Sequence, residues 1–215
     1  MLLYYITDRT RFPGGESARQ SALLQKIAEA ARAGVDFIQL REKDLPARQA
    51  EALAGEVLRV IRENSAVTAA GVPSCRLLIN SRTDVALACG ADGVHLPAND
   101  ISPAEVRDVW RRGQKVPPII TVSCHNLADV AGAASQGADF AIFAPVFEKR
   151  GSPAVQPSGI SGLREACRHK LPVLALGGVT LENVPRCLQA GAAGIAAIRL
   201  FQENDVAEVV RALRG

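Results

Sequence analysis

The chain has few of the features that suit a nucleic acid or a membrane. Aromatic residues make up only 4% of its 215 residues, and its 25 basic and 22 acidic residues leave a net charge of +3. No block of like charge stands out, so no extended anionic surface is expected as a partner. We therefore predict a small-molecule ligand, no nucleic acid and no membrane, and leave open whether two copies pair as a homodimer.

Cysteine pairs and long apolar runs are missing as well. The sequence contains five widely spaced cysteines, an odd number without the close pairs of a zinc or redox site. They are Cys75, Cys89, Cys124, Cys167 and Cys187. The opening MLLYYITDR meets charged residues after seven positions, which is too short for a secretory core or a membrane span. We expect a reducing, cytoplasmic location and a first strand at this point.

Short apolar runs alternate with longer amphipathic ones throughout, as in parallel strands joined by crossover helices. The second helix is expected at 46–63, and others follow Ser102 and Thr180. We predict an α/β fold, a (β/α)₈ TIM barrel forming a single domain over residues 1–215, with a doubly wound sheet as the alternative. The eight predicted strands are 3–6, 37–41, 76–80, 93–96, 119–123, 140–143, 173–176 and 194–198.

An internal repeat supports the barrel. The segments AGVDFIQL, GADGVHL, GADFAIF and GAAGIAAI begin at Ala33, Gly90, Gly137 and Gly191, about two β/α units apart. In each copy a helix is expected to end at glycine, whose left-handed conformation closes the helix before the next strand. These glycines are interpreted as scaffold.

The polar residues that end the second and third strands are the first site candidates, because TIM barrels bind substrate at the carboxyl ends of their strands. Strand alternation places Gln39, Arg41 and Lys43 on one face. Asn80 ends the third strand, and Ser81 after it is a candidate helix cap. Surface ion pairs are the alternative explanation for the charges.

The fourth and fifth strands carry the next candidates. Asp100 is either a ligand of a hard cation such as Mg²⁺ or a cap for the helix near Pro103. The fifth strand ends with Ser123 and His125, which places a histidine beside a hydroxyl at the predicted mouth. His125 is either an acid/base group or a structural hydrogen-bonding residue.

The last two strands predict a phosphate site. Gly177 and Gly178 allow a close backbone approach, helix starts at Thr180 and near residue 200 offer free N–H groups, and Arg199 beside Ile198 adds a cation. A tight turn at the two glycines is the alternative. Residues 147–159 have no periodicity and carry Lys149 and Arg150, which predicts a mobile lid.

These residues occur in stretches that resemble thiamine phosphate synthase and its relative, the thiazole tautomerase of thiamine biosynthesis. The resemblance covers nearly the whole chain, with the stretches in family order and spacing. They are YYITDR, DFIQLREKD, LLINSRTDVALACGADGVHL, ITVSCHN, GADFAIFAPVF, PVLALGGVTLENV and AGAAGIAAI.

The resemblance implies a transferase reaction. A pyrimidine diphosphate loses pyrophosphate, and the nitrogen of a thiazole phosphate captures the pyrimidine carbocation. Residues matching Arg41, Lys43 and Asn80 hold the diphosphate, the one matching Gln39 contacts the pyrimidine, and the one matching Asp100 binds Mg²⁺. Ser123 and Gly178 match positions near the thiazole phosphate.

Departures from the family pattern leave two alternatives. Ser81 stands where the synthase has a second metal-binding carboxylate, Glu148 and the residues after it replace a Thr-x-Thr-Lys segment, and Arg199 replaces a serine. Lys149 or Arg150 is the expected substitute in that segment. A metal-independent tautomerase using His125, or a non-catalytic binder of phosphate or a thiamine precursor, is the alternative function.

Overall fold

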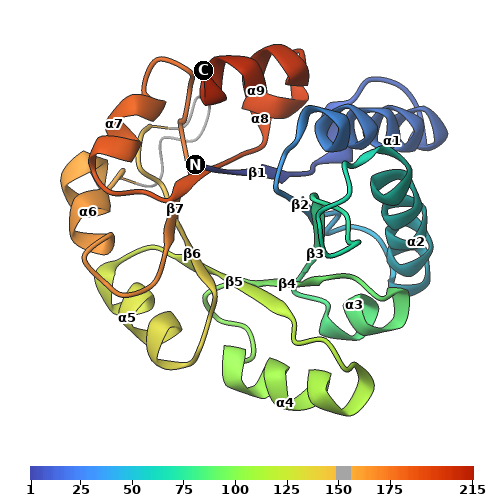
Figure 1. Cartoon of the computed structure of the whole chain (residues 1–215), viewed down its shortest axis with the longest axis horizontal. Helices are drawn as coiled ribbons and strands as arrows, with labels where there is room; N and C mark the ends of the chain where they lie inside the picture. Colours follow the sequence, from blue (N-terminus) through green and yellow to red (C-terminus); the bar gives the residue numbers. More distant parts are fainter. Residues whose placement is uncertain (149–155) are drawn as a thin grey trace.

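The protein is a closed barrel of eight parallel strands in a computed structural model that describes residues 1–148 and 156–215. Strands pair in chain order, and β1 closes the ring against β8 (Figure 1). The strands are β1 (Leu2–Ile6), β2 (Phe37–Leu40), β3 (Arg76–Asn80), β4 (Gly93–Leu96), β5 (Ile119–Cys124), β6 (Phe140–Phe143), β7 (Val173–Ala175) and β8 (Gly194–Ala197). The predicted TIM barrel is confirmed, with each predicted strand end within one residue.

Helices surround the barrel as an outer ring (Figure 1). They are η1 (Arg9–Arg11), α1 (Glu16–Ala33), α2 (Ala47–Asn64), α3 (Thr83–Cys89), α4 (Pro103–Gly113), α5 (Leu127–Ser135), α6 (Gly159–Ala166), α7 (Val184–Gln189), α8 (Arg199–Gln202) and α9 (Val206–Arg214). The expected helix at 46–63 is α2, displaced by one residue because Pro46 is its N-cap. No helix in the described part of the chain is long and apolar enough to cross a membrane.

The repeat has a structural role that its glycines only partly explain. Gly34 and Gly90 end their helices in the left-handed conformation, as predicted. The aspartate two residues after the glycine accepts a backbone N–H from the preceding odd-numbered strand. The three bonds, all 2.8 Å, are Leu3 N to Asp36, Leu77 N to Asp92, and Ile120 N to Asp139. The fourth repeat has Ala193 at this position.

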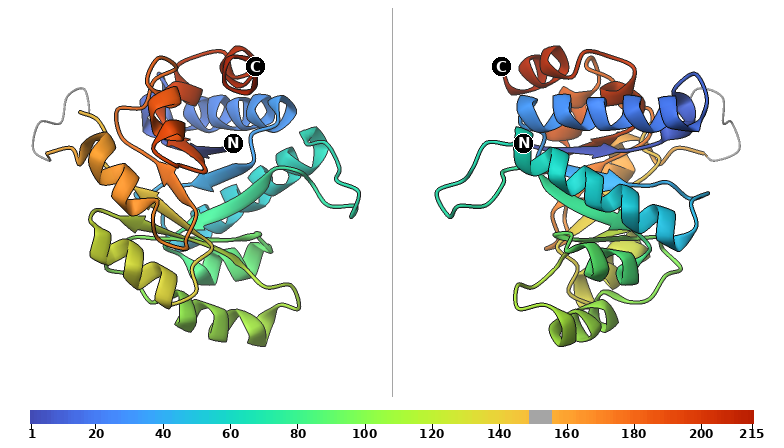
Figure 2. Two further views of the ribbon diagram at one scale, coloured as in Figure 1. Left: turned by 60° about the vertical axis from the view of Figure 1, so that its left-hand side comes forward. Right: turned by 90° about the vertical axis from the view of Figure 1, so that its right-hand side faces the viewer.

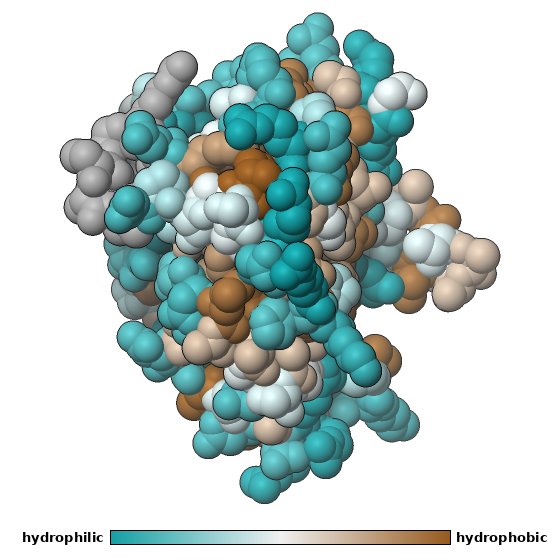
Figure 3. Space-filling view, turned by 90° about the vertical axis from the view of Figure 1, so that its left-hand side faces the viewer, coloured by the Kyte–Doolittle hydropathy of each residue, from teal (hydrophilic) through white to brown (hydrophobic). Residues whose placement is uncertain are grey.

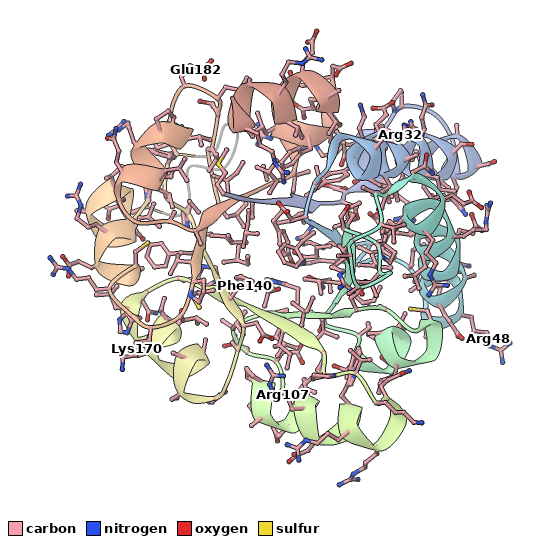
Figure 4. All side chains as sticks on the ribbon, viewed as in Figure 1. Arg32, Arg48, Arg107, Phe140, Lys170 and Glu182 are labelled. Carbon is pink, nitrogen blue, oxygen red and sulfur yellow. The ribbon has the colours of Figure 1, made fainter. Side chains whose placement is uncertain are left out.

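Apolar and aromatic side chains fill the inside of the barrel. The rings of Tyr4, Phe37 and Phe140 follow one another with centroids 5.8 and 5.4 Å apart, and Phe140 is labelled on the barrel wall in Figure 4. The other buried members of this inner cluster are Ile6, Leu78, Ile142, Leu174 and Ala196. Because the interior is packed, a ligand can reach only the ends of the strands.

Arg48, labelled on α2, points away from the barrel, whereas Arg107 on α4 reaches the carbonyl of Gly137 and the carboxylate of Asp139 (Figure 4). The segment between α2 and β3 departs from this compact outline as a projecting arm (Figure 2). The arm carries Val67, which is 67% exposed, and the space-filling view shows its weakly polar and apolar colouring (Figure 3). It lies before β3, and therefore at the end of the barrel opposite the predicted site.

Candidate active site

Two amides from neighbouring strands meet at the carboxyl end of the barrel. The Nε2 of Gln39 on β2 donates to Oδ1 of Asn80 on β3 at 2.8 Å. Gln39 is only 1% exposed, and its Oε1 is buried without a hydrogen-bond partner among the described residues. A buried acceptor without a partner is costly unless a ligand donates to it. The structure therefore brings these two candidate site residues together, while their contact with substrate stays a prediction.

The two cations after β2 lie at different depths. Arg41 is half-buried, and its charge contributes, after burial, to the lowered pKa of His95, which places the guanidinium near that ring. Lys43 is exposed and lines a cavity of about 350 Å³ together with Asn80 and Ser81. Both cations therefore follow β2 at the carboxyl end of the barrel, with Arg41 more buried than Lys43.

A buried ionic network holds this loop, and sequence reasoning missed it. The carboxylate of Glu42, 2% exposed, accepts from the hydroxyl of Thr7 at 2.6 Å and from the backbone and guanidinium of Arg9. Arg9 also pairs with Asp44 and lowers the pKa of that carboxyl. The backbone N–H of Arg41 donates to Thr7 at 3.0 Å. The ITDR stretch (6–9) and the REKD stretch (41–44) are therefore joined by hydrogen bonds and ion pairs that orient the loop after β2.

Ser81 and Asp100 are brought together from the β3 and β4 loops. The hydroxyl of Ser81 donates to Oδ2 of Asp100, whose Oδ1 accepts the N–H of Ile101 at 2.8 Å. The capping alternatives for both residues were wrong. Helix α3 has no side-chain cap, and α4 is capped by Ser102 in a capping box with Glu105. Ser81, with φ +64°, instead turns the chain toward Asp100.

The histidine beside the hydroxyl is not the one expected. His125 is exposed, and its Nδ1 lies 2.8 Å from the carbonyl oxygen of Ala144. Ser123 instead contacts His95, whose Nε2 is 2.8 Å from the hydroxyl and whose Nδ1 is 2.8 Å from Thr121. Strand alternation was the missed signal, since His95, two residues after Gly93, lies on the inner face of β4.

Burial controls the charge of His95. The ring is buried in the barrel, and desolvation together with the positive charge of Arg41 lowers its pKa to about 3. Both effects disfavour the imidazolium, since burial penalises any charge and a nearby cation repels a second one. His95 is therefore neutral at physiological pH and acts as one hydrogen-bond donor and one acceptor.

The loop after β7 forms the opposite side of the mouth. Gly177 and Gly178 have φ values of 97° and 64°, and a Cβ on Gly178 would lie 2.4 Å from the carbonyl oxygen of Glu148. Asn183 ties the loop down, because its Nδ2 donates to the carbonyl of Gly178 and its Oδ1 accepts from the N–H of Thr180, both at 2.9 Å. The two glycines therefore form a tight turn that packs closely against Glu148, while the approach of a phosphate to this loop stays a prediction.

A helix start at Thr180 was wrong. Asn183 uses its side chain to close a turn, and α7 begins only at Val184 with proline next to it. The predicted helix near residue 200 is present as α8, which begins at Arg199 and has four residues. Ile198, half-buried, packs against the inner barrel cluster beside this start.

Two further predictions concern a lid at 147–159 and a metal site at Asp100. Lys149, Arg150 and most of the predicted lid lie outside the described residues. Within the described ranges, 1–148 and 156–215, no group of three or more His, Cys, Asp or Glu residues is placed to hold a metal ion. A cation at Asp100 would therefore need further oxygen ligands of other kinds, for example a hydroxyl, water or substrate.

Comparisons with known proteins indicate one family. Residues 3–201 match the family model described as thiamine monophosphate synthase. A protein of Geobacter sulfurreducens is 41% identical over 98% of this chain and 92% of its own length. The thiamine-phosphate synthase of Methanoculleus marisnigri is 36% identical over 99% of this chain and 93% of its own.

A solved structure supports the same assignment. The thiamine phosphate pyrophosphorylase of Pyrococcus furiosus superposes with a TM-score of 0.79 and 29% sequence identity, covering 99% of this chain and 93% of that chain. The match therefore includes the strands, the loops that carry the site and the outer helices alike. The chain belongs to the thiamine monophosphate synthase family.

Proposed function

We propose that the chain is a thiamine-phosphate synthase, a transferase that joins a pyrimidine diphosphate to a thiazole phosphate and releases pyrophosphate. The observation that carries the proposal is the set of polar groups at the carboxyl ends of β2–β5. In this set Gln39 bonds to Asn80, His95 bonds to Ser123, and the charge of Arg41 acts on His95. Family membership indicates which reaction such a set serves.

This set suits a reaction in which negative charge develops on a leaving group. The carbon–oxygen bond of the pyrimidine diphosphate breaks, its electron pair stays with pyrophosphate, and the thiazole nitrogen then bonds to the carbocation. Arg41 and Lys43 supply positive charge to the departing oxygens, and Asn80 supplies an amide donor. Such preorganised groups stabilise a transition state because they need no reorientation as charge develops.

Two further features suit the organic parts of the substrates. The unpartnered Oε1 of Gln39 offers an acceptor for an amino group on the pyrimidine. The loop at Gly177 and Gly178 allows a phosphate to approach its backbone closely, beside Ile198 and Arg199 at the start of α8. These two features support a pose with the pyrimidine on the β2 side and the thiazole phosphate on the β7–β8 side.

The donor set at Asp100 fits Mg²⁺ in a limited way. Mg²⁺ requires oxygen ligands, keeps several waters, and is often held by one or two carboxylates together with substrate phosphates. Asp100 provides one carboxylate, and the hydroxyl of Ser81 at its side provides a neutral oxygen. When bound, the ion would neutralise charge on the diphosphate, and Asp100 would be its protein anchor.

One observation favours the tautomerase as a second candidate. The Nδ1 of His125 faces a carbonyl oxygen, which can only accept a hydrogen bond, so Nδ1 carries the proton. In the neutral form of this exposed ring, Nε2 is then the nitrogen that can accept a hydrogen. A proton shift on a thiazole carboxylate phosphate needs a base of this kind and no metal.

The two candidates separate in one assay. Pyrophosphate release from the pyrimidine diphosphate and thiazole phosphate is measured with Mg²⁺ and with a chelator. The synthase predicts release that depends on Mg²⁺ and is unaffected by exchange of His169 for Gln. No release, with isomerisation of the thiazole carboxylate phosphate that is lost in His125→Gln, would instead establish the tautomerase. Binding of either substrate without turnover would identify a non-catalytic binder.

A further inference from the structure

A chain of hydrogen bonds runs through the barrel interior from β1 to the mouth. The hydroxyl of Tyr4 lies 3.1 Å from Oγ1 of Thr121, which lies 2.8 Å from Nδ1 of His95. The Nε2 of His95 lies 2.8 Å from the hydroxyl of Ser123. Tyr4 and Thr121 are fully buried and Ser123 is half-buried. This hydrogen-bond chain therefore has a closed end at Tyr4 and an end at Ser123 that ligands can reach.

The buried end at Tyr4 determines which group donates each hydrogen bond. Among the described residues, the hydroxyl of Tyr4 has one hydrogen-bond partner, Thr121. A buried phenol hydrogen without an acceptor is costly, so Tyr4 donates to Thr121. The hydroxyl hydrogen of Thr121 then has one acceptor left, the Nδ1 of His95. That nitrogen must therefore be the unprotonated one.

The tautomer of His95 follows. Since Nδ1 accepts the hydrogen of Thr121 and is unprotonated, the ring carries one hydrogen and is neutral. With Nδ1 as acceptor, the hydrogen is on Nε2 and is donated to the oxygen of Ser123. The hydroxyl hydrogen of Ser123 is not used by this chain. The opposite direction would leave Tyr4 with a buried, unused donor.

We propose that Tyr4, Thr121 and His95 are positioning residues that hold Ser123 as a hydrogen-bond donor to an anionic oxygen of the ligand. The positive charge of Arg41 near the same ring favours an anion at this point. The proposal rests on the proposed function for the identity of the anion, a phosphate or diphosphate oxygen of the substrate. The direction of the hydrogen bonds does not depend on it.

The tautomer can be measured directly. Nitrogen-15 NMR of the labelled protein distinguishes protonated from unprotonated ring nitrogens, and His95 is assigned with His125→Gln and His169→Gln variants, which leave it as the only histidine. We expect Nε2 protonated and Nδ1 unprotonated in the wild type. In Tyr4→Phe the fixed direction is lost, and the two tautomers should mix. Protonated Nδ1 in the wild type would overturn the proposal.

Anion binding supplies the functional readout, with inorganic pyrophosphate as the probe in titration calorimetry. Ser123→Ala should weaken binding about tenfold, as expected for loss of one hydrogen bond to a charged group. Tyr4→Phe should weaken it about threefold, although the substituted oxygen lies at the closed end of the chain. Combining the two should add nothing to Ser123→Ala, because Tyr4 acts through that hydroxyl.

Tyr5→Phe is the matched control. Tyr5 is an equally buried phenol on the same strand, but it donates to Gln202 at 3.1 Å and is not part of this series of hydrogen bonds. Both Tyr→Phe variants should lower the unfolding temperature, and only Tyr4→Phe should weaken pyrophosphate binding. Equal weakening in both, or additive losses with Ser123→Ala, would reject positioning. A wild type with the expected tautomer that fails to bind pyrophosphate would reject the anion as ligand, and synthase turnover is assayed separately.

Discussion

Gly178 offers a test of how closely the β7 loop must approach the end of β6. In Gly178→Ala, the new Cβ would lie 2.4 Å from the carbonyl oxygen of Glu148 and 2.8 Å from Cβ of Phe147. The φ of +64° adds strain of about 1 kcal/mol for an L-residue, and overpacking adds about 1–3 kcal/mol. The backbone of one segment must therefore move, and the proposed phosphate loop moves with it.

Gly90→Ala separates strain from displacement. Gly90 has a similar φ of +71°, but a Cβ added there would have no other atom within 4 Å, and the residue ends α3 away from the mouth. We expect Gly90→Ala to lose about 1 kcal/mol of unfolding free energy in urea with unchanged kinetics. Gly178→Ala should lose about 2–4 kcal/mol and raise KM for the thiazole phosphate about tenfold or more. Equal stability losses and unchanged KM would refute the close approach.

Four other predictions address the cations, the metal, the repeat and the buried histidine. Arg41→Ala should lower kcat/KM for the diphosphate by about 10²-fold or more. The control Arg48→Ala, on the exposed face of α2, should leave kcat/KM unchanged. Unchanged turnover in Arg41→Ala would reject the role of Arg41. Ser81→Asp adds a carboxylate at a position whose φ of +64° aspartate tolerates, so half-maximal activation should need less Mg²⁺, and an unchanged activation curve would argue against a metal site at Asp100. Asp92→Ala leaves the N–H of Leu77 without its acceptor and should cost about 1–3 kcal/mol in urea unfolding, clearly more than Asp108→Ala in an exposed ion pair. The pKa of His95 is lowered from 6.5 to about 3, so the unfolded state binds more protons than the folded state below about pH 6.5. The free energy of unfolding should therefore fall by about 2 kcal/mol between pH 7 and pH 5. This fall should be absent in the His95→Gln variant.

The fold was readable because its signals are local. A buried parallel strand needs a short apolar run, and a crossover helix needs an amphipathic one, so each of the eight strands was found within one residue. The error at Thr180 has a local cause too. The side chain of Asn183 competes with the helix by bonding to Thr180 and Gly178, which delays α7 to Val184.

The candidate site was readable only where strand alternation applies. Gln39 and Asn80 were singled out as strand-end residues, and the structure brings them together. The roles of loop residues were harder to predict, because the same polar residue can either cap a helix or bond to a residue far away in the sequence. Asp100 thus contacts Ser81 rather than capping α4, and His125 points to Ala144 rather than to Ser123.

The amino-acid order by itself specified the barrel, its repeat and the family, because these depend on spacing along the chain. Closure of the barrel decided everything that depends on distance between strands. It joined Thr7 and Arg9 to Glu42, and it enclosed His95 where burial and Arg41 remove its charge. Charge state and hydrogen-bond direction depend on what surrounds a group in space, and that is known only after the eight strands have closed.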